Sequence, residues 1–269
     1  MDWRCKAALT AVAIVLLLAA AQRLGRHMAG ILTGLPTVTG PALAWLAFEH
    51  GEFYAVDAAI GSVAACAACA VFALTYERAS RRTGPLMSLI IASAPTALAT
   101  VALQWIAGSL LASLATAVGA SLVIHAALAG RGARARSTAV RLRGEPWVTA
   151  GVAGLVSGAV SVLAISVGSF WAGMMASPPL IAAAMAMHEH LRREHQDVRD
   201  FLRGYVGGLI GRGGYGAVFA LLVGPLGIGP AAACAALAGC AVTCAALRLL
   251  APQRRADGRP NTLSSREAR

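Results

Sequence analysis

Half of the histidines in this chain fall in one polar stretch, from His188 to Asp200, which also contains four of its twelve acidic residues. Histidine and carboxylate clusters are typical of zinc sites and of general acid–base catalysis. Zinc ligands on one helix face are four residues apart, whereas His188, His190 and His195 are two and five residues apart. Interleaved arginines would also repel a cation. The spacing therefore predicts no metal site in this stretch.

Three other interpretations of the stretch stay open. A solvated, salt-bridged connection between two buried helices is the simplest one. His188, His190 and His195 could instead gate a transport path, because histidine changes its charge near neutral pH. Alternatively, His188, Glu189 and His190 could form the catalytic surface of an intramembrane enzyme that acts on a lipid-linked substrate. The choice depends on the elements that hold these residues.

Those elements are predicted to be membrane-spanning helices. The sequence of 269 residues is 58% hydrophobic and 13% charged, with a mean hydropathy of +0.67, which soluble domains do not reach. Apolar runs of about twenty residues, long enough to cross the hydrocarbon core, recur along the chain. We predict an all-α polytopic membrane protein with nine spans, at Ala7–Leu24, Met28–Phe48, Phe53–Tyr76, Leu86–Trp105, Gly108–Ala129, Trp147–Val167, Phe170–Met187, Phe201–Val223 and Gly229–Leu250.

The basic residues behind the net charge of +11 are distributed according to this topology and do not indicate a nucleic-acid surface. Arginines gather in the odd-numbered connections and after the last span, whereas the even-numbered connections contain no lysine or arginine. The positive-inside rule makes the arginine-rich side cytoplasmic. We expect a multi-pass protein of a bacterial inner membrane, with a cytoplasmic C-terminus and no nucleic-acid partner. Met1–Leu24 is interpreted as a retained helix with the N-terminus outside; a cleaved signal sequence is the alternative.

Two motifs occur twice in the same order, which indicates an internal duplication. Ala29–Pro36 matches Ala172–Pro179 at an offset of 143 residues, and AVFAL at Ala70–Leu74 recurs at Ala217–Leu221 at an offset of 147 residues. The offset is five spans, an odd number, so the second copy is predicted to be inverted in the membrane. The predicted organisation is a first repeat, a basic cytoplasmic loop, a second repeat and a disordered basic tail, at residues 1–130, 131–146, 147–250 and 251–269.

Both copies of the first motif place proline near the middle of a predicted span. Pro36 interrupts the second span and Pro179 the seventh. A proline inside a helix removes a hydrogen bond and costs about 3 kcal/mol, so such breaks persist in a membrane where they are buried in protein or line a wet cavity. Paired breaks in two halves are typical of a midplane binding site in transporters. Hydroxyl groups at the breaks come from Thr33, Thr37, Thr39 and Ser177.

The eighth predicted span carries a charge at the same depth. Residues 203–216 contain seven glycines, with Arg212 near the middle of the span. An arginine at the bilayer centre costs about 2.5–3.5 kcal/mol, which is tolerated where the side chain faces a polar interior. We predict that Arg212 attracts an anionic solute, with Tyr205 and Tyr215 as hydroxyl contacts; a structural arginine that binds carbonyls freed at a break is the alternative. The glycines would permit close helix contact or local unwinding.

The predicted build resembles the five-plus-five inverted-repeat secondary transporters, such as the bile-acid–sodium symporter and cation–proton antiporter group, with one helix lost. The resemblance implies a pair of broken helices that cross near the midplane, with their half-helix ends facing substrate and ion. We therefore expect a secondary transporter of a small anionic solute, not an enzyme. The residues expected to bind the solute are Pro36, Thr37, Thr39, Ser177, Pro179, Arg212 and Tyr215.

Coupling to Na⁺ or H⁺ would use the freed carbonyls with Thr33 and Thr37, and no cofactor is expected. The expected partners are the solute, the lipid bilayer and further copies of the chain in a homo-oligomer. A non-transporting membrane subunit or assembly factor, in which Arg212 only holds helices together, is the main alternative function. Cys66 and Cys69 lie inside an apolar span and are interpreted as packing residues.

Overall fold

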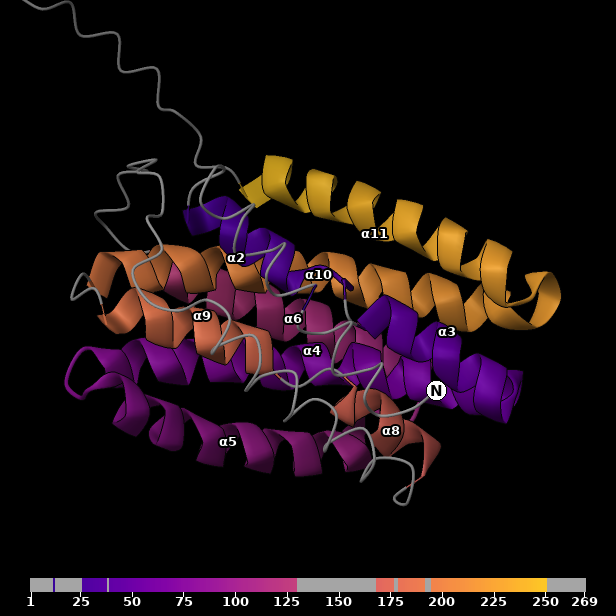
Figure 1. Ribbon diagram of the computed structural model, residues 1–269, viewed down its shortest axis with the longest axis horizontal. Coiled ribbons are helices and arrows are strands. Elements are labelled where there is room, and N and C mark those ends of the chain that lie inside the picture. The colour runs from indigo at the N-terminus through magenta and orange to yellow at the C-terminus, as the bar shows by residue number, and fades with distance from the viewer. Residues whose placement is uncertain are drawn as a thin grey trace, which may run out of the picture.

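The computed structural model describes residues 26–37, 39–129, 168–176, 179–191 and 195–250, together with Val12. Every regular element within these residues is an α-helix (Figure 1). The helices are α2 (Arg26–Gly34), α3 (Thr39–His50), α4 (Glu52–Ser80), α5 (Pro85–Ile106), α6 (Leu110–Leu128), α8 (Ser169–Met175), α9 (Leu180–Leu191), α10 (His195–Leu226) and α11 (Ile228–Leu250).

Seven helical segments in this part of the chain are long and apolar enough to cross a membrane. They coincide with the second to fifth and the seventh to ninth predicted spans. The all-helical fold is therefore confirmed, and it is consistent with a polytopic membrane protein. Apart from Val12, the first and sixth predicted spans, Ala7–Leu24 and Trp147–Val167, lie outside the described residues, as do the basic loop at 131–146 and the tail at 251–269. The total of nine spans stays a prediction.

Two of the seven segments are discontinuous where the sequence places proline. A short gap separates α2 from α3, and another separates α8 from α9. Pro36 and Pro179 lie in these gaps. Each gap forms there because proline has no N–H with which to continue the hydrogen bonds of the preceding turn. The α2–α3 segment and the α8–α9 segment run in opposite directions through the bundle (Figure 1).

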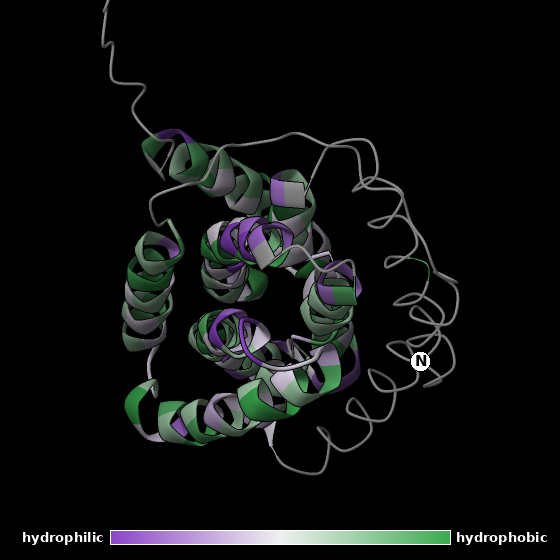
Figure 2. Ribbon diagram, turned by 90° about the vertical axis from the view of Figure 1, so that its left-hand side faces the viewer, coloured by the Kyte–Doolittle hydropathy of each residue, from purple (hydrophilic) through white to green (hydrophobic). Residues whose placement is uncertain are grey.

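α4 and α10 form the centre of the bundle, where they pack against each other and are buried along most of their length. α2 lies along α10 and α8 lies along α4, while α6 contacts both central helices. α5 packs on α4, and α11 packs on α10. Viewed along the bundle, the outer helices surround this centre (Figure 2). They expose apolar side chains such as Trp105, Leu111 and Leu237, as expected of helices that face lipid.

α10 is continuous through its glycine-rich stretch. The glycines therefore provide close helix contact and not local unwinding. Gly204 and Gly208 lie against the α2 backbone at His27 and Ile31, where a side chain would collide with main-chain atoms. Small residues at such contacts are typical of helix pairs in membranes, where the backbones can approach closely.

The histidine-rich stretch differs from the solvated connection that its composition predicts. α9 continues to Leu191 and α10 begins at His195, so most of the stretch is helical. Glu189 is 1% exposed and His190 is 8% exposed. The reason is tertiary packing: the end of α9 lies against α4, where the Tyr76 hydroxyl is 3.4 Å from Nδ1 of His190. The prediction of a solvated connection is wrong for these residues.

Candidate functional site

Arg212 lies in the buried centre of the bundle, halfway along α10, and is only 7% exposed. The groups that act on it electrostatically include Cys66 and Cys69 on α4 and Tyr205, two turns earlier on α10. The guanidinium therefore places a positive charge between α4 and α10 in the buried centre of the bundle.

The break between α2 and α3 lies beside this part of α10. Gly34, the last residue of α2, packs against Tyr205 and Gly208. On the other side of the break, a Cβ placed on Gly40 would lie 3.2 Å from the hydroxyl oxygen of Tyr215. The break thus lies alongside the part of α10 between Gly208 and Tyr215, which includes Arg212. The sequence-based expectation that the broken helix and Arg212 share one depth agrees with these contacts.

The break between α8 and α9 opens onto a cavity of about 320 Å³ between α4, α5 and α8–α9. Pro179 lines the cavity, whereas Ser177 lies outside the described residues. Cys69 also lines it, and Cys69 adjoins Arg212. A volume of this size is at the lower end of known ligand sites, at roughly 300 Å³. The polar side chains along the cavity are Cys69, Ser93, Thr96 and Thr100.

The residues predicted to bind the solute or the ion through hydroxyl groups differ in their burial and in their contacts. Thr33 is buried and donates to the Ala29 carbonyl in its own helix (2.8 Å), so its proton faces no solute. Thr37 is exposed in the first break, and Thr39 is buried at the start of α3. Tyr215 is buried and stacks on a phenylalanine one turn later, with ring centroids 6.0 Å apart. Of the two tyrosines expected to line the site, Tyr205 is the one that acts on Arg212 electrostatically.

The histidine-rich stretch does not join this site. His195 begins α10 and Arg212 is seventeen residues further along the same helix, which is about 25 Å at the rise of an α-helix. His188 and His190 end α9 at the same end of the bundle. The two candidate sites found in the sequence are therefore separate in space.

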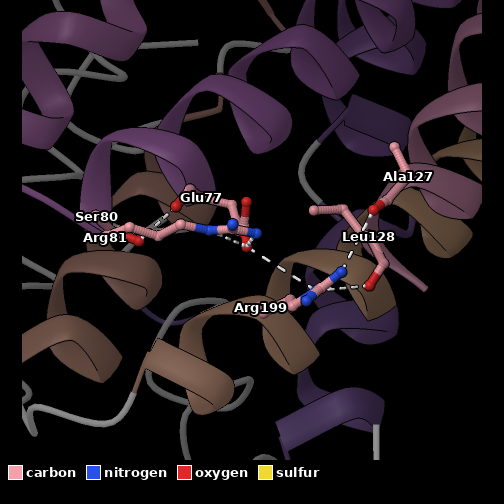
Figure 3. A network of polar contacts seen from close by, with 6 residues as sticks. All are labelled: Glu77, Ser80, Arg81, Ala127, Leu128 and Arg199. Atoms are coloured by element: carbon pink, nitrogen blue, oxygen red, sulfur yellow. Dashed lines mark hydrogen bonds and ion pairs between the residues drawn. The ribbon is translucent and has the colours of Figure 1, made fainter. Parts of the chain in front are cut away.

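That end of the bundle holds a polar network across three helices (Figure 3). The buried carboxylate of Glu77 on α4 accepts from Arg81 Nη2 at 2.6 Å and lies 3.9 Å from Arg199 Nε on α10. Arg199 Nε also donates to the Leu128 carbonyl at the end of α6, at 2.8 Å. One turn further along α10, Arg203 Nε donates to Nε2 of His125 at 3.3 Å. Sequence reasoning did not find this network, because Glu77, His125 and Arg199 lie on three helices that are far apart in the sequence.

These features define the class: an all-helical chain with several membrane-length apolar helices, two of them discontinuous, and a buried arginine at the breaks. No protein-family model matches the chain, and comparison with curated proteins and with solved structures gives no significant match for any part of it.

Proposed function

We propose that this protein is a secondary transporter of a small anionic solute, built from two inverted repeats in a bacterial inner membrane. The observation that carries the proposal is the placement of the α2–α3 break beside the buried Arg212. Broken membrane helices present backbone groups to a ligand at the depth where lipid-exposed backbone is excluded. A buried guanidinium supplies the complementary charge for an anion.

The inverted repeat is supported by one pair of equivalent helix contacts. Gly30 on α2 packs against the backbone of Tyr205 on α10. The offsets of the two sequence motifs, 143 and 147 residues, relate Gly30 to Gly173 and relate Ala58 to Tyr205. Gly173 on α8 packs against the backbone of Ala58 on α4. Each half therefore has a glycine contact between equivalent helices, although the backbone nearest to Gly30 is that of Phe201, one turn before Tyr205.

A second pair of contacts follows the same offsets to within one helical turn. Gly208 on α10 packs closest to Ile31 on α2, and Gly61 on α4 packs closest to Phe170 and then to Met174, one turn later, on α8. The offset of 143 residues relates Ile31 to Met174, and the offset of 147 residues relates Gly61 to Gly208. Glycine contacts that recur between equivalent helices to within one turn support a duplicated helix pair that docks in a similar way twice.

The larger helix pairings follow this symmetry too. The pairing of α4 with α5 has its equivalent in that of α10 with α11, and the contact of α3 with α11 has its equivalent in that of α9 with α5. The charge breaks the symmetry, because the residue equivalent to Arg212 at the offset of 147 is Ala65. The positive charge of the anion site would therefore come from the second repeat alone, while the α2–α3 break would come from the first.

Alternating access would follow from rocking of one repeat against the other around this site. Thr37 and the carbonyls freed at the breaks would provide oxygen ligands if a cation accompanies the solute. A non-transporting membrane subunit is the second candidate. In that case Arg212 would only hold α10 against α4. The two candidates differ in whether an anion binds.

The test is the thermal stability of the purified protein with chloride, sulfate, phosphate, acetate and succinate. A ligand at a hundred times its dissociation constant stabilises the folded state by about 2.7 kcal/mol. We expect one of these anions to raise the melting temperature of wild type and of a control, Arg82→Ala, but not of Arg212→Ala. Arg82 is exposed at the end of the bundle and so leaves the site unchanged.

Uptake of that anion into liposomes containing the protein should be lost in Arg212→Ala while the variant still folds. If no anion shifts wild type, and Arg212→Ala does not fold, the arginine is structural and the transport proposal fails.

A further inference from the structure

His125 occupies an unusual position in the last turns of α6. It is 3% exposed, and its Nε2 is 3.3 Å from Nε of Arg203 on α10. Arginine Nε is always a donor, so Nε2 of His125 must be the acceptor and the ring must carry its proton on Nδ1. The contact therefore exists only while His125 is neutral.

The other face of the imidazole is not satisfied by the protein. Nδ1 of His125 is buried and makes no hydrogen bond within the described residues. The backbone of Arg203 also acts on the ring, and its carbonyl accepts a main-chain hydrogen bond in the interior of α10. A buried N–H group without a hydrogen-bond acceptor costs free energy, so this donor is expected to bind a water molecule or an ion.

Nδ1 of His125 faces a glycine on the neighbouring helix. A Cβ on this residue, Gly207 on α10, would be in ordinary van der Waals contact with Nδ1, at 3.9 Å. Ser121, one turn earlier on the same face of α6, is fully buried, and its hydroxyl also makes no hydrogen bond within the described residues. Two unsatisfied polar atoms on one buried helix face, opposite a glycine, are typical of an internal hydrated site.

We propose that His125 is a proton-binding site and that the proton it takes up is the ion coupled to solute movement; the second half of this inference rests on the proposed transport function. Nδ1 already carries the proton of the neutral ring, so an incoming proton adds to Nε2 as Arg203 releases it, and the ring becomes an imidazolium in which both nitrogens are donors. Nε2 then no longer accepts from Arg203, and two cations face each other. The contact between α6 and α10 breaks.

The charged groups around His125 make this step specific. From α10, Arg203 faces it directly, and Arg199 holds the end of α6 through the Leu128 carbonyl. From α2, His27 acts on it electrostatically. From α4, Tyr76 and Glu77 are the titratable groups at this end, with Glu77 engaged by Arg81, and α5 contains no titratable residue. Arg203 is therefore the cation that proton uptake displaces.

The proposed proton and anion sites lie on one helix. Arg203 and Arg212 are nine residues apart on α10, about 14 Å along its axis. A displacement of Arg203 can therefore reach the anion site as a rigid shift of α10 against α6. One proton carried with a monoanion would move no net charge across the membrane.

The test compares the melting temperature at about pH 7.5 and at about pH 5 in wild type, His125→Gln, His27→Gln and His50→Gln. The glutamine amide oxygen can accept from Arg203 but takes up no proton. Since protonation removes a native contact, stability is present at the higher pH and lost as the pH falls. We expect this loss in wild type to exceed that in His125→Gln by about 2–4 °C. His50→Gln should behave as wild type does, and His27→Gln, which removes a group that acts on His125 electrostatically, should change the loss by less than His125→Gln does.

A histidine with the same pKa in the folded and the unfolded protein would make His125→Gln shift the melting temperature equally at both pH values. Equal pH dependence of wild type and His125→Gln would therefore overturn the proton site. If His125→Gln does not fold, Arg203→Gln provides the same test, because removing the cation should also reduce the loss in acid. Arg203→Gln with the pH dependence of wild type would overturn the inference as well.

Coupling is tested with the anion identified through Arg212. In liposomes with an acidic exterior, wild type should accumulate this anion, whereas His125→Gln should exchange it without accumulating it. Accumulation by His125→Gln would overturn the coupling. If the stability depends on His125 and pH but no anion binds, the proton site stands and the transport function fails. The two failures are therefore distinguishable.

Discussion

Gly208 on α10 lies directly against the backbone of Ile31 on α2, and a Cβ at this position would be 2.9 Å from the Cα of Gly34. No side chain fits there without moving one helix away from the other. We predict that Gly208→Ala lowers the free energy of unfolding by about 1–3 kcal/mol, as for overpacked cores. Thermal or chemical unfolding in detergent measures the change.

The adjacent Gly207→Ala is the matched control, since its Cβ would meet only ordinary contact distances. It should be neutral or slightly stabilising, because alanine is favoured over glycine in helices by about 1 kcal/mol. Equal effects of the two substitutions would contradict the close approach of α2 and α10.

Gly61→Ala tests the equivalent contact in the first half of the chain. A Cβ on Gly61 would collide with the Phe170 backbone on α8, just as one on Gly208 collides with α2. We expect a loss of about 1–3 kcal/mol here too, measured in the same way. Gly119→Ala on α6, where nothing lies within 4 Å, is the control. Full tolerance of alanine at Gly61 would remove one of the two contact pairs that support the repeat.

Arg199 and Arg81 both meet Glu77, yet their removal should have unequal effects. The Arg81 side chain is 54% exposed, so Arg81→Ala should cost no more than about 1 kcal/mol. Arg199 is 28% exposed and also donates to the Leu128 carbonyl, which ties α10 to α6. Because a charged donor is lost from that helix end, Arg199→Ala should cost about 1.5–3 kcal/mol. Unfolding at two salt concentrations measures both; a larger effect of Arg81→Ala would contradict the network.

The arginine-rich turn after α4 is expected on the cytoplasmic side. In a variant whose six cysteines are replaced by alanine, Arg82→Cys should react with a membrane-impermeant maleimide only in inverted vesicles. Phe53→Cys, at the opposite end of α4 and 90% exposed, should react in intact cells. The reverse pattern would invert the proposed topology.

The apolar spans and the breaks could be predicted from the sequence, because both depend on local properties. A run of about twenty apolar residues is helical in a membrane whatever its neighbours are, since its backbone must satisfy its own hydrogen bonds. Pro36 and Pro179 end helices for an equally local reason, the missing N–H. The predicted burial of Arg212 also follows from its position in a span.

The environment of each buried polar group depends instead on pairings between distant segments. Glu189 and His190 have the composition of a solvated connection, but the packing of α9 against α10, α5 and α2, with Tyr76 of α4 beside His190, buries them. Cys69, interpreted as a packing residue, lies at the junction of Arg212 and the α8–α9 cavity. His125 and Arg203 are 78 residues apart in the chain. Hydropathy and proline placement determine which segments cross and where they break; only tertiary packing decides which charges meet, because that depends on how the helices face one another.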